Sequence, residues 1–210
     1  MIKKENKIID IHSHVQFPAY DNDREAVIKR AQEAGVKMLA VGTQISTSEA
    51  AIKLAHQYPE DVWATVGYHP NHAVVRSDRS VGVTNVWHHD PKEQKEPVQE
   101  KFDIERLRKL ALDKKVAAIG ECGLDYYRLG TNDKVQETKD LQKKVFLEQV
   151  KLAQELQKPL MIHCRPSYVK TAEGKAISTD DAYEDLPQLL ITNYQLPKLV
   201  HFYVGSLETT

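Results

Sequence analysis

The chain has 210 residues, enough for one sizeable domain or two small ones. Charged residues make up 28% and hydrophobic residues 41%, which excludes a disordered, collagen-like or low-complexity protein. Lys and Arg number 29 and Asp and Glu 30, so the formal charge is -1, and this balance excludes binding of nucleic acid through bulk positive charge. Any polyanion must be held locally, by a few side chains or by bound metal.

The sequence contains no uninterrupted apolar run of the length that a signal peptide or a membrane span requires. The basic N-terminal segment is followed by a short apolar stretch that Asp10 interrupts. The two cysteines, Cys122 and Cys164, are too few for a disulfide framework. We therefore expect a cytoplasmic protein that does not associate with membranes and has no obligate protein partner.

Short apolar runs rich in Val and Ile alternate with longer amphipathic segments along the chain. The predicted strands are residues 8–15, 36–43, 62–69, 115–121, 160–164 and 198–204. The predicted helices are residues 21–34, 46–58, 103–113, 134–157 and 180–194. Gly35 is expected to end the first helix, and Ser46 and Asp180 are expected to be N-caps of the second and fifth.

The segment 71–101 has neither pattern, and we interpret it as an insertion after the third strand. Because it follows the third strand, we expect it to lie on the face of the protein that carries the active site. The favoured interpretation is a surface insertion without a catalytic role.

Six strands that alternate with helices indicate the parallel α/β class. The first strand leads into His12-Ser13-His14 and not into the Gly-rich turn of an open dinucleotide-binding sheet. Polar residues of the kinds that bind metals end at least five strands, which is typical of a barrel with its chemistry at one face. We predict an α/β protein with a (β/α) TIM-type barrel, a single domain over residues 1–210 with six of the eight strands in this chain.

The residues at the strand ends favour a metal centre. His12 and His14 are two apart on a predicted strand, so both can reach one ion from the same side. Glu121 ends the fourth strand between glycines, which suits a bridging carboxylate. His163 and His201 end the fifth and sixth strands. Each could instead be a hydrogen-bonded or salt-bridged residue of the core, but four strand ends with such residues together favour a metal site.

Five motifs occur in order between residues 9 and 205. They are Ile9-Asp10-Ile11-His12-Ser13-His14, Val66-Gly67-Tyr68-His69-Pro70, Ile119-Gly120-Glu121-Cys122-Gly123-Leu124-Asp125-Tyr126, Ile162-His163-Cys164-Arg165 and His201-Phe202-Tyr203-Val204-Gly205. With them the chain resembles the TatD-related metal-dependent deoxyribonucleases of the amidohydrolase-like barrels. The Gly-Glu-x-Gly-Leu-Asp block is the most selective motif. Glu121 also disfavours relatives that carry a carboxylated lysine at this position.

The resemblance implies two divalent metal ions. His12 and His14 would bind the first, Glu121 would bridge to the second as the catalytic carboxylate, and His163 and His201 would complete the second site. Two such ions lower the pKa of a bound water and neutralise phosphodiester oxygens. Imidazole ligands suit Zn²⁺ or Mn²⁺, whereas Mg²⁺ prefers oxygen, and the identity stays open among these ions.

The resemblance also implies residues that bind substrate. His69, in Tyr-His-Pro, is assigned to substrate phosphate and not to metal. The neighbouring loops carry four further candidates for phosphate or base contacts, namely Asp125, Arg128, Arg165 and Tyr168.

The implied function is a metal-dependent hydrolase of phosphodiester bonds, a deoxyribonuclease that removes nucleotides from the 3′ end of single-stranded DNA with a water activated by two metals. One alternative keeps the metal centre but acts on a small cyclic amide, an ester or a phosphorylated metabolite. Another is a metal-binding remnant without catalysis.

The resemblance implies one more ligand, an aspartate at the end of the eighth strand that acts as general base, and the chain ends before this position. A closed barrel of this type has eight strands and about 250 residues. We therefore expect a C-terminally truncated chain with impaired activity. The alternatives are strands supplied by a second chain or by domain swapping, and a rearranged fold.

Overall fold

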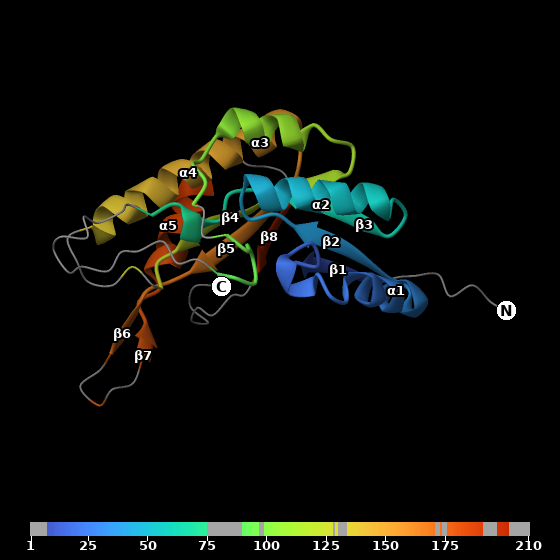
Figure 1. Ribbon diagram of the computed structural model, residues 1–210. Helices are drawn as coiled ribbons and strands as arrows, with labels where there is room; N and C mark the ends of the chain where they lie inside the picture. The colour runs from blue at the N-terminus through green and yellow to red at the C-terminus, as the bar shows by residue number, and fades with distance from the viewer. Residues whose placement is uncertain are drawn as a thin grey trace.

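A computed structural model of the chain describes residues 8–74, 90–96, 99–127, 129, 134–170, 173, 176–190 and 197–201. Its centre is a six-stranded sheet with the order β1-β2-β3-β4-β5-β8, in which every neighbouring pair is parallel. The sheet curls into a half-barrel (Figure 1). The predicted barrel class is confirmed in this form, with the six strands in chain order.

All six predicted strands are present. They are β1 (Ile8–Ser13), β2 (Val36–Val41), β3 (Val62–Val66), β4 (Val116–Asp125), β5 (Leu160–Arg165) and β8 (Lys198–His201). Two further strands, β6 (Tyr168–Lys170) and β7 (Ala176–Ser178), form an antiparallel hairpin that projects from the body in Figure 1. This hairpin was not predicted, because each of its strands is only three residues long.

The helices cover the outside of the curled sheet. They are α1 (Arg24–Ala34), α2 (Ile45–Gln57), α3 (Ile104–Ala111), α4 (Val135–Leu156) and α5 (Asp181–Leu190), with short 3-10 helices η1 (Pro18–Tyr20) and η2 (Pro70–His72). α1 packs on β2, α2 on β2 and β3, α3 on β3 and β4, α4 on β4, and α5 on β4 and β5. Burial on both faces explains why the middle strands read as nearly continuous apolar runs.

Helix α4 shows how an apolar stripe fixes this packing. Phe146, Val150 and Ala153 recur at spacings of three and four residues, so they lie on one face of the helix and are buried in the core. Burial of one such phenylalanine stabilises the fold by roughly 2–3 kcal/mol. The outer strand β1 is different, since Ile8 and Ile9 are 62% and 59% exposed.

The helix ends agree in part with the sequence prediction. Gly35 ends α1 in the left-handed conformation, with φ of 74°. The prediction of Ser46 as an N-cap was wrong, because Gln44 takes this position and its backbone N–H donates to the hydroxyl of Thr47 at 3.0 Å. Asp180 lies directly before α5, as predicted.

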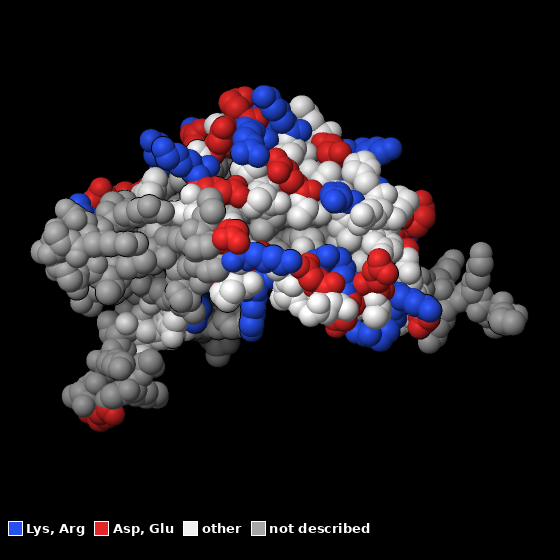
Figure 2. Space-filling view, in the orientation of Figure 1, with Lys and Arg blue, Asp and Glu red and all other residues white. Residues whose placement is uncertain are grey.

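β4 runs four residues further than predicted, to Asp125, because residues 122–125 pair with residues 162–165 of β5. Within the described residues, no helix has the length and apolar character to cross a membrane. Figure 2 shows Lys and Arg side chains interspersed with Asp and Glu over the described part of one face, in keeping with the near-neutral formal charge.

Candidate metal centre

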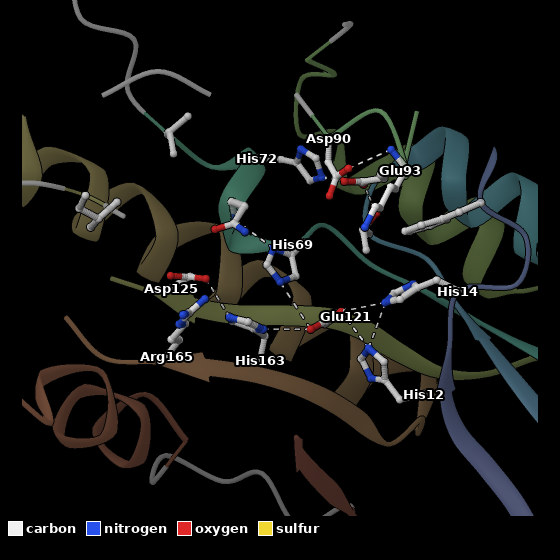
Figure 3. A pocket seen from close by; sticks show the side chains of 16 residues that line it. His12, His14, His69, His72, Asp90, Glu93, Glu121, Asp125, His163 and Arg165 are labelled. Carbon is white, nitrogen blue, oxygen red and sulfur yellow. Dashed lines mark hydrogen bonds and ion pairs between the residues drawn. The ribbon is translucent and has the colours of Figure 1, made fainter. Parts of the chain in front are cut away.

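Residues in or just after the carboxyl-terminal halves of β1, β3, β4 and β5 converge on one point of the half-barrel (Figure 3). Parallel strands all end at the same edge, so side chains that are far apart in the sequence meet there. Glu121 of β4 lies at the centre of this cluster, and its side chain is almost fully buried. Its two carboxylate oxygens face different groups of histidines.

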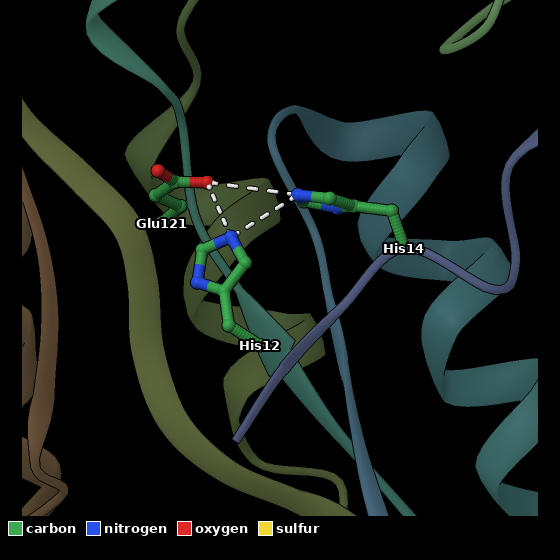
Figure 4. Close-up of side chains that lie close together, drawn as sticks. All are labelled: His12, His14 and Glu121. Atoms are coloured by element: carbon green, nitrogen blue, oxygen red, sulfur yellow. Dashed lines mark hydrogen bonds and ion pairs between the residues drawn. The ribbon is translucent and has the colours of Figure 1, made fainter. Parts of the chain in front are cut away.

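The first group is His12, His14 and Glu121 (Figure 4). The two Nε2 atoms are 3.1 Å apart, and they lie 3.4 Å and 4.0 Å from Glu121 Oε2. His14 follows the last residue of β1, yet both imidazoles reach the same point, as the spacing predicts. The three atoms are close enough to share one ion.

The orientation of His14 leaves its Nε2 available as a ligand. His14 Nδ1–H donates to the carbonyl oxygen of Val41 at 3.0 Å, so the neutral ring carries its lone pair on Nε2. Burial lowers the pKa of His14, which favours this neutral form. Phe17 stacks on the ring, with centroids 4.4 Å apart, and holds its plane.

The second group joins the other oxygen of Glu121 to His163. His163 Nδ1 lies 3.0 Å from Glu121 Oε1, and His163 Nε2 lies 3.0 Å from Asp125 Oδ2. Burial alone would lower the pKa of His163, but the hydrogen bonds to Asp125 and Glu121 outweigh it and raise this pKa to about 9. Asp125 is 3% exposed and holds the far side of the imidazole, an arrangement common for histidines that bind metals.

His69 also lies near Glu121, with Nε2 3.5 Å from Oε1, but its hydrogen bonds do not suit a ligand. Its Nδ1 accepts the backbone N–H of Asn71 at 3.1 Å, so the neutral ring carries its proton on Nε2. Burial lowers the pKa of His69 and favours this neutral form. His69, which lines the pocket, therefore carries a proton on the nitrogen that faces Glu121 Oε1, and its role toward substrate phosphate stays a prediction.

Two buried glutamines of α4 hold the strand ends that carry the site. Gln142 accepts the backbone N–H of Asp125 and donates to the carbonyl oxygen of the same residue, at 2.9 and 3.0 Å. Gln149 makes the same pair of bonds with the backbone of Tyr68, at 2.8 and 3.0 Å. The two glutamines are seven residues apart and so share one face of the helix. These bonds tie the backbone at Tyr68, just after β3, and at Asp125, the last residue of β4, to α4.

A pocket of about 400 Å³ opens over this cluster. Asp90, Lys92 and Glu93 line one side of it, so the described part of the segment 71–101 forms a wall of the pocket, at the face that the sequence predicts (Figure 3). Glu93 accepts hydrogen bonds from His72 Nε2 at 3.0 Å and from the hydroxyl of Thr43. Burial opposes its ionised form, but the contact with His72 outweighs it and lowers the pKa of Glu93.

The sequence prediction missed Thr43, His72 and Glu93. His72 was visible in principle, because it lies three residues after His69 and only two beyond the end of that motif. Glu93 gives no such signal, since it is 50 residues from Thr43 in the sequence.

The remaining predicted residues fall in different places. Arg165 lines the pocket, and Tyr168 begins β6 with its ring against that of Tyr127. His201 ends β8, and its Cα is paired with that of His163 in the sheet, but its side chain lies outside the described part of the structure. Arg128 also lies outside the described residues.

The donor set fits divalent cations. When Nδ1 of each ring carries the proton, His12 and His14 direct their Nε2 lone pairs at the point that Glu121 Oε2 also faces. Acceptor atoms packed this closely repel one another, and a cation between them removes that repulsion. Nitrogen and carboxylate donors suit Zn²⁺ or Mn²⁺.

The chain is also similar to proteins that are already known. A family model described as TatD related DNase matches residues 9–210. A protein named 3'-5' ssDNA/RNA exonuclease TatD from Cronobacter sakazakii is 35% identical over 164 residues, covering 78% of this chain and 51% of the relative. Its namesake from Pantoea ananatis is 37% identical over 166 residues, covering 79% and 53%. The chain spans about half the length of these curated relatives.

A third relative of the same name, from Salmonella typhimurium, is 35% identical over 202 residues, covering 96% of this chain and 61% of the relative. Among solved structures, YJJV, a TatD homolog from Escherichia coli k12, superposes with a TM-score of 0.62 at 26% identity. The match covers 97% of this chain and 63% of that one.

Proposed function

The chain belongs to the TatD-related DNase family, and on that premise we propose that it contributes the metal centre of a nuclease that hydrolyses phosphodiester bonds of single-stranded DNA from the 3′ end. The observation that carries this proposal is the position of Glu121 between two sets of histidines. One of its oxygens faces His12 and His14, and the other faces His163. A carboxylate with this placement suits a bridge between two cations.

We propose His12, His14 and Glu121 as ligands of the first ion, and Glu121, His163 and His201 as ligands of the second. Two divalent ions held here would supply Lewis-acid polarisation of the phosphodiester and a lowered pKa for a bound water. A ligand set of four imidazoles and a carboxylate suits Zn²⁺ or Mn²⁺ better than Mg²⁺, which prefers oxygen ligands. The near-neutral charge of the chain is consistent with a substrate that is held locally.

The other residues of the pocket have roles of their own in this proposal. His69 donates its Nε2 proton toward the phosphate, while Asp125 keeps the imidazole of His163 in place. Arg165 adds positive charge at the rim of a pocket that is otherwise rich in carboxylates. Tyr168 and Arg128 are proposed to contact the bases or phosphates beyond it.

The test is release of nucleotides from a single-stranded oligonucleotide labelled at its 5′ end, with Mn²⁺ present. We expect a ladder of products that shorten from the 3′ end, and no products with a chelator or in His163→Ala. His56→Ala is the matched control, because His56 is an exposed histidine that pairs with Asp113 away from the pocket, and it should keep the activity. Release that persists with chelator would refute the proposal, and hydrolysis of cyclic amides without release of nucleotides would favour the alternative substrate class.

A further inference from the structure

Arg165 is a cation in the pocket without a carboxylate partner among the described residues. Its register neighbour across the sheet is Asp125, but the carboxylate of Asp125 accepts hydrogen bonds from His163 Nε2 and from the backbone N–H of Tyr127, both at 3.0 Å. An arginine keeps its charge at any physiological pH. The guanidinium is therefore available to an anion that enters the pocket.

The guanidinium of Arg165 lies over the ring of a tyrosine. Its Cζ lies 3.6 Å from the ring centroid of Tyr127, within the range of a close cation–π contact. The ring of Tyr168 packs edge-on against the ring of Tyr127, with the two centroids 5.4 Å apart and the two planes at 87°. The adjacent backbone is fixed as well, because the N–H of Tyr126 donates to the carbonyl oxygen of Arg165 at 2.8 Å. Stacking of this kind limits the rotamers of an arginine while its N–H groups stay directed outward in the plane.

Arg165 lies next to the proposed metal centre, not within it. His163 and Arg165 are two residues apart on β5, so their side chains emerge from the same face of the strand. A strand rises about 3.3 Å per residue, which places Arg165 roughly 7 Å further toward the carboxyl end. An anion bound by Arg165 is therefore a neighbour of a group bound at Glu121 and His163.

We propose that Arg165 anchors the phosphate adjacent to the scissile one and that Tyr127 is a positioning residue that holds Arg165 for this contact. This inference rests on the proposed function, because it assigns a second phosphate of the same substrate. A planar guanidinium fits a phosphate with two parallel hydrogen bonds, and Tyr127 reduces the freedom that the side chain loses on binding. No base-specific contact is needed, which suits a nuclease that acts on many sequences.

The experiment compares binding of two fluorescent ligands to the metal-loaded protein by anisotropy. One is a trinucleotide with two phosphorothioate linkages, which resist hydrolysis, and the other is a dinucleotide with one. We expect Tyr127→Leu to raise the Kd for the trinucleotide by about 3- to 10-fold and to change the Kd for the dinucleotide less. Tyr127→Phe keeps the ring and should restore binding to within about twofold.

The Arg165→Met variant tests whether Tyr127 acts through Arg165. If Tyr127 acts through Arg165, adding Tyr127→Leu to Arg165→Met changes the Kd no further. A matched control is Lys37→Met, which removes a cation 5.2 Å from the ring of Trp63 at the other end of the sheet, and it should leave the preference for the trinucleotide unchanged. Equal effects of Tyr127→Leu with and without Arg165, or on both ligands, overturn the inference. Because binding does not need turnover, a protein that binds the trinucleotide but cleaves no DNA would contradict the proposed function and not this inference.

Discussion

Asp125→Asn tests whether a carboxylate outside the ligand set controls the metal centre. In the native site, Asp125 Oδ2 accepts the Nε2–H of His163 and Oδ1 accepts the backbone N–H of Tyr127, each at 3.0 Å. Asparagine has nearly the same shape but only one oxygen. Whichever way its amide is turned, one of the two donors faces an NH₂ group and loses its hydrogen bond.

The expected loss follows from burial. Asp125 is 3% exposed, so water does not readily replace the missing acceptor. A buried donor without an acceptor costs about 1–3 kcal/mol. If that donor is His163, the imidazole is also less basic and less well oriented, and loss of such an outer partner lowers metal affinity by about 10- to 100-fold. We therefore expect Asp125→Asn to lower the affinity for Mn²⁺ by about 10- to 100-fold.

Isothermal titration calorimetry with Mn²⁺ measures this effect directly. Asp103→Asn is the matched control, because Oδ1 of Asp103 alone accepts the two N–H groups that it caps at the start of α3, and asparagine keeps that oxygen. This control should leave Mn²⁺ affinity unchanged. Urea unfolding of the metal-free variants shows whether each substituted protein is folded under the conditions of the titration.

Two outcomes would refute the role of Asp125. A folded Asp125→Asn protein with native Mn²⁺ affinity would show that the contact with His163 does not support the centre. Native Mn²⁺ affinity together with a raised KM for an oligonucleotide would instead assign Asp125 to the substrate, as the sequence predicts.

Three further predictions concern the surroundings of the centre. Glu93→Ala removes the carboxylate that ties the pocket wall to the sheet, so trypsin should cleave within residues 90–96 at least about threefold faster. Gly123→Ala places a Cβ about 2 Å from a carbonyl oxygen of β5 at a φ of 140°, and urea unfolding should show a loss of roughly 2–4 kcal/mol, against about 1 kcal/mol for Gly35→Ala. Burial opposes the ionised form of Asp181, but its contacts, with Lys139 first among them, lower its pKa from 3.8 to about 2. Asp181→Asn should therefore cost about 1 kcal/mol of stability above pH 3.8, after allowance for solvent screening, and this pH-dependent part should vanish as the pH falls toward 2.

Each of these predictions has an outcome that contradicts it. Unchanged tryptic cleavage in Glu93→Ala, or equal acceleration by the exposed Glu96→Ala, would show that the wall is held by other contacts. Similar losses for the two glycine variants would mean that φ alone matters and the close approach of the strands does not. A stability difference for Asp181→Asn that stays constant from pH 7 to pH 2 would place the effect in packing and not in ionisation.

The strand ends could be predicted from the sequence because their signals are local. The apolar run that ends in His12-Ser13-His14 predicts a strand. It also predicts that the two histidine side chains point the same way, since side chains alternate between the two faces of a strand. The match to the family model confirms the predicted family, and the likeness to the solved structure confirms the predicted barrel class. The ligand set itself stays a prediction, which the distances around Glu121 support.

The hydrogen bonds of Gln142, Gln149 and Glu93 could not be predicted, because their partners are far away in the sequence and only the packed fold brings them together. Gln142 and Gln149 read as polar positions of an amphipathic helix, yet both are buried and bind strand ends across 17 and 81 residues of sequence. Glu93 reads as one charge among many in an irregular segment. A polar side chain becomes part of a site only when the fold removes its water and supplies a partner, and the sequence alone does not state either condition.

The glycines around Glu121 connect these observations. A Cβ at Gly120 would lie 2.3 Å from the carbonyl oxygen of Met161, and one at Gly123 would lie 2.0 Å from that of His163, so β4 and β5 can run this close only because both positions lack a side chain. That approach extends the pairing to Asp125, beyond the predicted end of the strand. The same pairing brings the carboxylate of Asp125 to the imidazole of His163 and leaves the neighbouring arginine without a carboxylate partner among the described residues. One local glycine pattern thus accounts for an oriented candidate ligand and for a cation that is available to the substrate.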